Sequence, residues 1–378
     1  MARIRDIRLI PLRYDMPKIR AYGMARGLIP FRQATIVEVV TEDGVVGLGE
    51  AWGPPGTLLA YLDVIRPFFL GRTLFEREHV LSEILGRLYH LGMQNEMIAC
   101  ISGINIAIFD AMGRTLGVSV ADLLGGRARD RIPCYASDGY LTNDPDNQLD
   151  RQVQRFAELG FPGCKIKIGL GPRSDEERCR LVREALGPDP LLMVDVNGNY
   201  TVDVTLESMR RIAPFDIHFY EEPLPPQDFE GYRRLSERAI VPVAAGEALY
   251  TVFDFAHLLK GRAVDVAQPD LTLVGGFDEA RKIATLCQVH NVRCTLHVWG
   301  GAVGLAAAVH FMAALIDYPH TDNPPYPRLL EYDVADNPRR DELLAEPLMP
   351  VDGAIPVPSG PGLGIELNPE TLARYRLG

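Results

Sequence analysis

The chain has 378 residues, of which 47% are hydrophobic and 24% are charged, and its formal net charge is −11. This composition is that of a globular protein, and the length suits a barrel of about 250 residues with a smaller second domain. The acidic balance provides no basic stripe that would neutralise phosphates, so nucleic acid is excluded as a predicted partner.

The N-terminal residues and the cysteines indicate in which cellular compartment we expect the protein. Residues 1–10 contain three arginines and no long apolar stretch. We therefore predict neither a signal peptide nor a membrane span, no membrane partner, and a cytoplasmic protein. The cysteines have no Cys-x-x-Cys spacing, and we interpret them as small core residues rather than disulfides or zinc ligands. They are Cys100, Cys134, Cys164, Cys179, Cys287 and Cys294.

The first third of the chain predicts an α+β domain over residues 1–128. Residues 3–14 alternate as a strand, residues 19–30 form a glycine-containing loop, and residues 34–52 predict a hairpin that turns at Asp43. Helical periodicity follows in three segments, near residues 57–70, 76–91 and 96–115.

A second domain is predicted over residues 129–335, and its first strand begins near Arg131. In the next apolar segment, Gly163 to Gly169, two lysines alternate with two isoleucines, which is the pattern of a strand. Lys165 and Lys167 therefore share one face of that strand. A solvated edge strand is the alternative interpretation of a Lys-x-Lys pair taken alone.

After Lys167 the chain repeats a short apolar run, an acidic residue or histidine, and a helix-like stretch. The polar residues recur every 23 to 28 residues, at Asp195, Glu221, Glu247, Asp270 and His297. One strand and one helix fill each interval, which predicts a (β/α)8-type barrel. Its strand ends converge on one face, where such barrels carry their catalytic groups. A segment rich in proline and glycine, residues 336–378, is expected to pack back on the first domain.

Three successive strand ends, at Asp195, Glu221 and Glu247, would bring three carboxylates together. Three carboxylates placed side by side repel one another and require a cation, and hard oxygen ligands suit Mg²⁺. The alternative is that each carboxylate caps the following helix or pairs with an arginine.

The next two strand ends, at Asp270 and His297, predict a proton-transfer dyad, because a carboxylate beside an imidazole fixes its tautomer and raises its basicity. Lysines on one side of a metal and a histidine on the other are suited to removing a proton next to a carboxylate and stabilising the enediolate that forms. The neighbouring ammonium and a divalent ion are expected to lower the pKa of Lys167, so that it can act as a base.

These residues together resemble the enolase superfamily, and within it the mandelate racemase subgroup, over essentially the whole chain. The resemblance implies a modified barrel of (β/α)7β type with an N-terminal capping domain completed by the C-terminal tail. It implies a Lys or His base with Mg²⁺, one ion per subunit, and a homo-oligomer, either octamer or dimer. The site residues that it implies are Lys165 and Lys167 as catalytic lysines with Lys167 as base, Asp270 and His297 as the dyad, Asp195, Glu221 and Glu247 as metal ligands, and Asn197 and Glu331 as substrate contacts.

Three shorter stretches, 297–300, 330–333 and 360–364, look most like those of galactarolactone cycloisomerases and acid-sugar dehydratases. Trp299, in the first of them, is predicted to contact substrate. In this family, specificity is attributed to the capping loop, here residues 19–30, where Arg20, Tyr22 and Arg26 are within reach of the distal end of a substrate. Surface solvation is the alternative for the two arginines.

Four functions remain open. The first is β-elimination from a sugar acid or its lactone after removal of the α-proton, by a dehydratase or a cycloisomerase. The second is a racemase or epimerase that acts by 1,1-proton transfer on an α-substituted carboxylate. The third is a binder of sugar acids without activity. The fourth is an enzyme that handles phosphate, since the glycine pairs at 275–276 and 300–301 would each expose a helix N-terminus to an anion.

Overall fold

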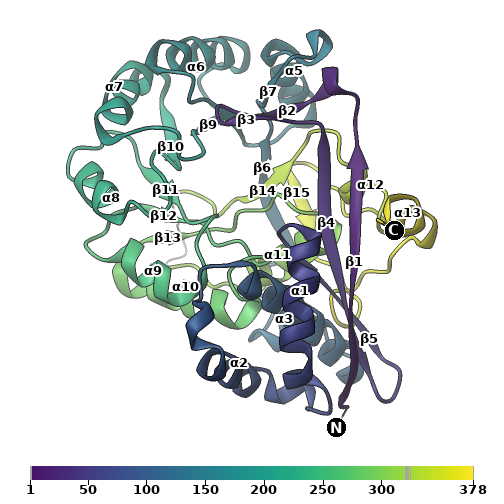
Figure 1. Cartoon of the computed structure of the whole chain (residues 1–378). Helices are drawn as coiled ribbons and strands as arrows, with labels where there is room; N and C mark the ends of the chain where they lie inside the picture. The colour runs from purple at the N-terminus through teal and green to yellow at the C-terminus, as the bar shows by residue number, and fades with distance from the viewer. Residues whose placement is uncertain (1, 320–322, 324, 378) are drawn as a thin grey trace.

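The computed structural model describes residues 2–319, 323 and 325–377. A barrel of strands and helices occupies one side of the molecule, and the long strands of the N-terminal part run along its other side (Figure 1). The chain thus combines a (β/α)7β barrel with an α+β capping part, which confirms the predicted fold class.

The capping part is built on a three-stranded antiparallel sheet in the order β1-β4-β5. Its strands are β1 (Ile4–Asp15), β4 (Phe31–Thr41) and β5 (Val46–Ala51). The hairpin between β4 and β5 turns at Asp43 and Gly44, and Gly44 has a φ of 89°, a left-handed conformation that glycine adopts without strain. The predicted strand and hairpin are therefore confirmed.

Helices cover this sheet. They are α1 (Pro55–Phe69), α2 (Arg77–Arg87), α3 (Glu96–Leu116) and the short α4 (Val120–Leu123). α1 and α3 contact the strands of the sheet, α2 packs on α1 and α3, and α4 packs on α3. Among the described residues, α3 is the one helix whose length and composition would suffice to cross a membrane, but 94% of that apolar window is buried inside the protein. Its apolar surface is used against β4, β5 and α1.

Eight parallel strands form the barrel, in the order β13-β12-β11-β10-β9-β8-β6-β14. Thr295, just after β13, donates its hydroxyl to the carbonyl of Leu329, just before β14, so the two ends of the ladder meet. The strands are β6 (Arg131–Ser137), β8 (Gly163–Lys167), β9 (Leu191–Asp195), β10 (Ile217–Glu221), β11 (Val243–Ala245), β12 (Val266–Ala267), β13 (Arg293–Cys294) and β14 (Leu330–Asp333).

One helix follows each of the first seven strands and packs outside the barrel, as amphipathic or wholly apolar sequence requires. These helices are α5 (Leu149–Leu159), α6 (Pro172–Leu186), α7 (Val202–Ile212), α8 (Phe229–Ser236), α9 (Thr251–Leu259), α10 (Gly276–His290) and α11 (Ala302–Ala314). Inside the barrel, below the predicted site, the apolar side chains of Tyr135, Met193 and Phe219 belong to one small core cluster.

The segment 19–30, predicted as a loop, instead contains a short hairpin. Its strands β2 (Tyr22–Met24) and β3 (Gly27–Ile29) pair with each other, and β2 also pairs with β7 (Leu141–Thr142) from the barrel part. The third strand comes from more than a hundred residues further along the chain, so no local pattern could have predicted this sheet.

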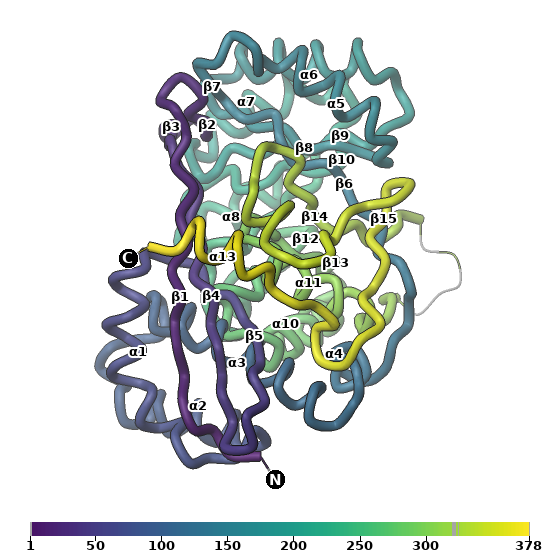
Figure 2. The backbone as a smooth tube through the Cα atoms, turned by 90° about the vertical axis from the view of Figure 1, so that its right-hand side faces the viewer, coloured from purple at the N-terminus to yellow at the C-terminus, as the bar shows by residue number. Residues whose placement is uncertain are grey.

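The C-terminal segment contacts both parts of the molecule (Figure 2). Its elements are α12 (Pro338–Asp341), β15 (Ala354–Pro356) and α13 (Pro369–Tyr375). β15 pairs with barrel strand β6, and α13 contacts β1 of the capping sheet. The domain boundaries at 128/129 and 335/336 stay predictions.

Candidate active site

The three predicted metal ligands lie together at the C-terminal end of the barrel strands. Asp195 ends β9, Glu221 ends β10, and Glu247 follows β11 by two residues. One carboxylate oxygen from each lies within 4.8 Å of the others. Asp195 and Glu221 are fully buried, and their charges are therefore costly unless cations neutralise them.

The two lysines of β8 are buried against these carboxylates, rather than solvated at a sheet edge. Lys165 pairs with Glu221, and its Nζ lies 3.8 Å from Asp195 Oδ2. The Nζ of Lys167 lies 2.5 Å from Asp195 Oδ2. The exposed edge-strand interpretation of the Lys-x-Lys pair is therefore wrong, because β8 is an interior strand of the barrel.

The charges of the protein alone do not lower the pKa of Lys167 as predicted. Burial and the Lys165 ammonium do lower this pKa, but the Asp195 carboxylate raises it, with smaller contributions from Glu247 and Glu221, and the net pKa lies above that of an ordinary lysine. The prediction combined the neighbouring ammonium with a divalent ion, and it did not include the close approach of the carboxylates. A divalent ion on those carboxylates would act in the opposite direction.

The predicted dyad is assembled. His297 Nδ1 lies 2.8 Å from Asp270 Oδ2, and Asp270 Oδ1 accepts hydrogen bonds from the backbone amide and hydroxyl of Thr272 at 2.7 and 2.6 Å. The other ring nitrogen, Nε2, lies 3.5 Å from Glu247 Oε2. Burial lowers the pKa of His297, but Glu247, Glu331 and Asp270 together raise it to about 10.

Glu331, on β14, closes the ring of charges between the lysines and the histidine. Its Oε1 lies 2.8 Å from Lys165 Nζ, and its Oε2 accepts the amide of Val298 at 3.1 Å. Burial raises the pKa of Glu331, but Lys165 and His297 oppose it and bring the pKa to about 2. This carboxylate therefore stays ionised over the physiological range.

Asn197 lies beside the carboxylates, as predicted, whereas Arg26 is engaged by the backbone. Asn197 Nδ2 donates to Glu247 Oε1 at 3.4 Å, and Asn197 has a φ of 50°, a left-handed conformation that asparagine tolerates. Arg26 donates to the carbonyls of Asn197 and Gly198 at 2.7 and 2.5 Å. It thus ties the capping hairpin to the loop after β9, and its role as a substrate contact stays a prediction.

Trp299 belongs to a group of aromatic side chains that joins the capping hairpin to the barrel. Its Nε1 donates to the hydroxyl of Tyr140 at 2.8 Å, and Tyr22 packs edge-on against Tyr140 with ring centroids 4.9 Å apart. The buried Arg32 guanidinium lies 4.3 Å from the Tyr22 ring, and its Nη1 is 2.7 Å from Asp333. The contact of Trp299 with substrate also stays a prediction.

Two site residues were missed in the sequence analysis. Gln268 donates to Glu221 Oε2 at 2.7 Å, and Glu222 is a further buried carboxylate whose pKa burial raises well above the usual value. Gln268 lies two positions before Asp270, so the two-residue period of a strand could have indicated it. Glu222 has a φ of 38°, and this backbone turn, which brings it inward, left no signal in the sequence.

The residues fit a divalent cation that binds oxygen. Among the described residues, the buried oxygens Glu247 Oε2 and Asn197 Oδ1 have no hydrogen-bond donor, although both lie at the carboxylate cluster. Carboxylate and amide oxygens are the ligands of Mg²⁺. The lysine ammonium groups neutralise Asp195 and Glu221 but do not reach these two oxygens.

At both glycine pairs that suggested a phosphate site, side chains of the capping part accept the backbone amides. Gly275 and Phe277 donate their amides to Ser102 Oγ and Asn105 Oδ1 at 2.7 and 2.9 Å. At the second pair, Glu50 accepts the Gly301 amide at 2.5 Å. These helix N-termini therefore bind the protein's own side chains, which argues against the phosphate hypothesis.

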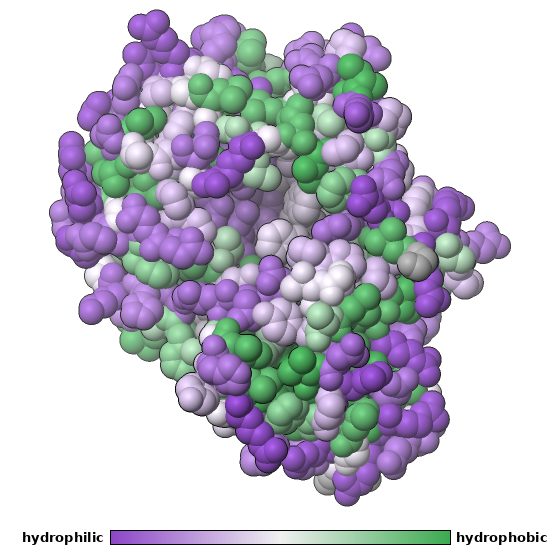
Figure 3. All heavy atoms as spheres, in the orientation of Figure 1, coloured by the Kyte–Doolittle hydropathy of each residue, from purple (hydrophilic) through white to green (hydrophobic). Residues whose placement is uncertain are grey.

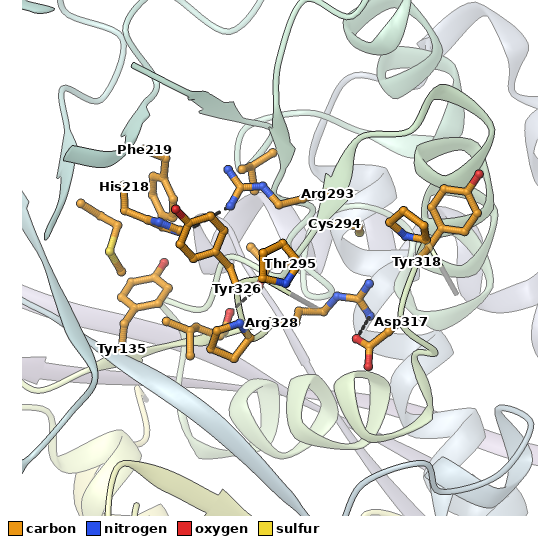
Figure 4. Close-up of a pocket in the computed structure, with 16 residues that line it drawn as sticks. Tyr135, His218, Phe219, Arg293, Cys294, Thr295, Asp317, Tyr318, Tyr326 and Arg328 are labelled. Carbon is orange, nitrogen blue, oxygen red and sulfur yellow. Dashed lines mark hydrogen bonds and ion pairs between the residues drawn. The ribbon is translucent and has the colours of Figure 1, made fainter. Parts of the chain in front are cut away.

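A cavity of about 170 Å³ lies at the opposite end of the barrel, where the strands begin (Figure 4). Tyr326 packs edge-on against His218 there, with ring centroids 4.9 Å apart, and Arg293 lies beside them. The rings of Tyr135 and Phe219 line its inner wall. Its lining contains none of the predicted site residues. The space-filling view shows a hollow near the centre of the barrel (Figure 3).

The barrel brings three carboxylates together between a lysine pair and a carboxylate-bound histidine. This arrangement is typical of barrel enzymes that transfer protons with the help of a metal ion. Two family models place the chain more closely. Residues 148–371 match the enolase C-terminal domain-like family, and residues 10–125 match the N-terminal domain of mandelate racemase and muconate lactonizing enzyme. The chain belongs to the enolase superfamily, in its mandelate racemase and muconate lactonizing enzyme group.

Known proteins resemble the chain over nearly its whole length. It is 39% identical to D-galactarolactone cycloisomerase of Agrobacterium fabrum, with 92% of both chains covered. It is 30% identical to arabinonate dehydratase of Saccharolobus solfataricus, with 99% of both covered. The crystal structure of 3,6-anhydro-D-galactonate cycloisomerase from Zobellia galactanivorans superposes with a TM-score of 0.88 at 32% identity and covers 100% of both chains.

Magnesium is present in a related structure. A racemase from Streptomyces coelicolor with bound magnesium superposes with a TM-score of 0.86 at 27% identity, over 99% of this chain and 100% of that chain. This finding agrees with the fit of Asp195, Glu221 and Glu247 to a divalent cation.

Proposed function

We propose that the protein removes the proton α to the carboxylate of a sugar acid or its lactone and then eliminates the β-oxygen, as a dehydratase or a cycloisomerase. One observation carries the proton-transfer part of this proposal. Two proton carriers stand at the two ends of one carboxylate cluster: Lys167 is 2.5 Å from Asp195, and His297 is 3.5 Å from Glu247. A carboxylate substrate held over the cluster would have a proton carrier on each side.

Asp195, Glu221 and Glu247 would hold one Mg²⁺ per subunit. When bound, the ion would supply positive charge beside the substrate carboxylate, where negative charge develops as the α-proton leaves. It would also balance the carboxylates that raise the pKa of Lys167. Asn197 would contact the substrate next to these ligands.

Lys167 and His297 would divide the proton transfers between them. One takes the α-proton and the other protonates the leaving oxygen, and the stereochemistry of the substrate decides which acts first. Asp270 holds the Nδ1 side of the imidazole, so Nε2 is the atom that exchanges the proton. Lys165 would bind the substrate carboxylate by charge. Glu331, which is ionised in the free protein beside Lys165, would hydrogen-bond the substrate carboxylate only after taking up a proton, because two ionised carboxylates have no donor between them.

Elimination is preferred to racemisation because of the relatives. The proteins that the chain matches at 39% and 30% identity are a cycloisomerase and a dehydratase, and both names describe chemistry on sugar acids or their lactones. Racemisation or epimerisation is the second candidate, favoured by the presence of proton carriers at both ends of the cluster, as 1,1-proton transfer requires.

A substrate screen tests the proposal. Purified protein with Mg²⁺ is incubated with mono- and diacid sugars and their lactones, and 2-keto product is detected by its semicarbazone absorbance. A hit on a sugar acid or lactone supports elimination. If the magnesium-loaded protein forms no keto product but exchanges the α-proton of its substrate in D₂O, the second candidate replaces the first.

The assembly and location of the protein are also proposals. We propose a cytoplasmic homo-oligomer, either octamer or dimer, as is common in this superfamily. Light scattering on the eluted protein measures the mass of the particle, and a mass of one chain at micromolar concentration would contradict the proposal.

A further inference from the structure

The residues of the dyad lie where the ladder of the barrel ends. β12 and β13 contain two residues each, and Asp270 and His297 follow them by three positions. The barrel ladder reaches His297, whose amide donates to the carbonyl of Pro269 at 3.3 Å, and beyond it the backbone depends on other contacts for its position. Several of those contacts come from the end of β5 in the capping part.

Glu50, on β5, binds the loop after His297 with both carboxylate oxygens. Its Oε1 accepts the amide of Gly301 at 2.5 Å, and its Oε2 accepts the amide of Gly304 at 2.9 Å. These amides belong to the N-terminus of α11, where a negative charge is favourable. The fit requires glycine, since a Cβ on Gly300 would lie 2.5 Å from Glu50 Oε1.

The same end of β5 also binds the loop that carries Asp270. The amide of Trp52 donates to the carbonyl of Thr272 at 3.1 Å, and Thr272 donates its amide and hydroxyl to Asp270. The methyl group of Thr272 lies 3.0 Å from the position of a Cβ on Gly304. Residues 50–52 of the capping part are thus in contact with both loops of the dyad.

The negative charge of Glu50 also interacts with a buried arginine, Arg339. The guanidinium of Arg339 is fully buried, and none of its three nitrogens has a hydrogen-bond partner among the described residues. Glu50 is the carboxylate that interacts most strongly with it. Removing that negative charge would leave the buried cation with only the weaker interaction of Asp333, so the charge and the shape of Glu50 both matter.

We propose that Glu50 is a positioning residue for His297, which acts through the amides of Gly301 and Gly304 and so makes the capping part necessary for one half of the active site. The kinetic part of this inference rests on the proposed function, whereas the structural part does not. Glu50 itself lies behind the loop and takes no part in the transfer of protons.

Glu50→Gln tests the inference first by hydrogen–deuterium exchange of the intact, magnesium-loaded protein. The amide side chain can accept one of the two hydrogen bonds, and we expect peptides over 297–304 to exchange roughly tenfold faster or more, while peptides over β8 exchange as in the wild type. Glu38→Gln, on the neighbouring strand β4, is the matched control and should change neither. Unchanged exchange over 297–304 in Glu50→Gln would overturn the proposal.

Kinetics then separate positioning from general damage to the fold. We expect kcat to fall roughly 10²-fold with little change in KM, because the catalytic ring is displaced while the metal and carboxylate contacts remain. In a His297→Asn background, Glu50→Gln should have no additional effect on residual exchange of the α-proton. An equal further loss in that background would mean that Glu50 does not act through His297.

Two further outcomes are distinguishable. If Glu50→Gln fails to fold, Glu50→Asp, which keeps the charge and shortens the reach, takes its place in the exchange experiment with the same expectations. If the wild type turns over no sugar acid or lactone, the proposed function fails, yet the exchange over 297–304 still decides the role of Glu50.

Discussion

The two halves of the active site are supported in different ways. Lys165 and Lys167 belong to β8, a strand of five residues that pairs with β9 along its whole length. Asp270 and His297 lie beyond strands of two residues, on loops that hydrogen-bond to the capping part. The lysine half is thus built into the barrel, while the histidine half is assembled between two parts of the chain.

This difference shows where the site tolerates change. A strand bonded on both sides holds its side chains by the ladder itself, so substitutions outside β8 should leave Lys167 in place. A loop held by a few hydrogen bonds shifts when one of them is lost. Substitutions in the capping part should therefore affect chemistry that depends on His297 and spare the lysines.

The largest effect is expected from Lys167→Ala, which removes a proton carrier from the rigid half. Turnover of the identified substrate should fall roughly 10³-fold, the usual contribution of a general acid or base. Lys260→Ala, at the exposed end of α9, is the control and should be unaffected. Steady-state kinetics measure both. If Lys167→Ala keeps more than a tenth of the wild-type rate, the assignment of this lysine is wrong.

Glu247→Gln tests the cation between the halves. Glu247 has no lysine partner in the described structure, so its neutralisation should leave the fold intact. Magnesium at a hundred times its Kd should stabilise the wild type by about 2.7 kcal/mol. We expect Glu247→Gln to lose most of this gain in thermal denaturation, whereas the exposed Glu237→Gln keeps it. Equal stabilisation of both variants would contradict the assignment of Glu247 as a ligand.

The sequence predicted the residues of the site better than it predicted what holds them. The regular spacing of polar residues at strand ends was sufficient to bring Asp195, Glu221 and Glu247 together and to pair Asp270 with His297, because parallel strands in a barrel end on one face. Glu50 could not be predicted in this way. It contacts a glycine 251 residues away, and no periodic pattern reports such a contact.

The same limit explains the capping hairpin. Its residues contain glycine and an exposed arginine, which are typical of a loop, and the strand that completes its sheet comes from the barrel. The lowered pKa expected for Lys167 with a divalent ion bound stays a prediction. The close approach of the carboxylates to this lysine was not foreseen, because a strand pattern gives the direction of a side chain but not its distance from carboxylates on neighbouring strands.

The pH dependence of stability at His310 tests the packing of α11, the helix that follows His297. It lies on α11, fully buried, where its Nδ1 accepts the amide of Ala121 at 3.3 Å and its Nε2 is 3.0 Å from the carbonyl of Leu363. Burial lowers its pKa from 6.5 to about 4. The unfolded chain therefore binds a proton before the folded one does, so the contribution of neutral His310 is complete above about pH 6.5 and is lost as the pH falls toward 4.

The expected loss at pH 5 is about 2 kcal/mol, from the difference between the two pKa values. Chemical denaturation of the wild type and of His310→Gln at pH 7.5 and pH 5 measures it. The stability advantage of the wild type should shrink by that amount on acidification. A constant advantage would show that His310 is not kept neutral by its position between the capping part, the tail and α11.

The smallest effect is expected from Arg26→Ala, at the contact of the capping hairpin with the loop after β9. Loss of its hydrogen bonds to Asn197 and Gly198 should raise KM about tenfold, which corresponds to a loss of about 1.4 kcal/mol, close to the contribution of one hydrogen bond from a charged group. Arg20→Ala is the matched control, because its nearest carboxylates lie at 3.9 and 4.0 Å. Equal changes in KM for Arg26→Ala and Arg20→Ala would contradict a specific role of the Arg26 hydrogen bonds.

The most direct test follows the α-proton of a hit sugar acid in D₂O by NMR, with the wild type, Lys167→Ala and His297→Asn. We predict 2-keto product from the wild type, no net turnover by either variant, and continued α-proton exchange in only one variant, the one that keeps the base. An α-deuterated epimer without keto product, or wild-type turnover in both variants, would contradict elimination between two opposed proton carriers.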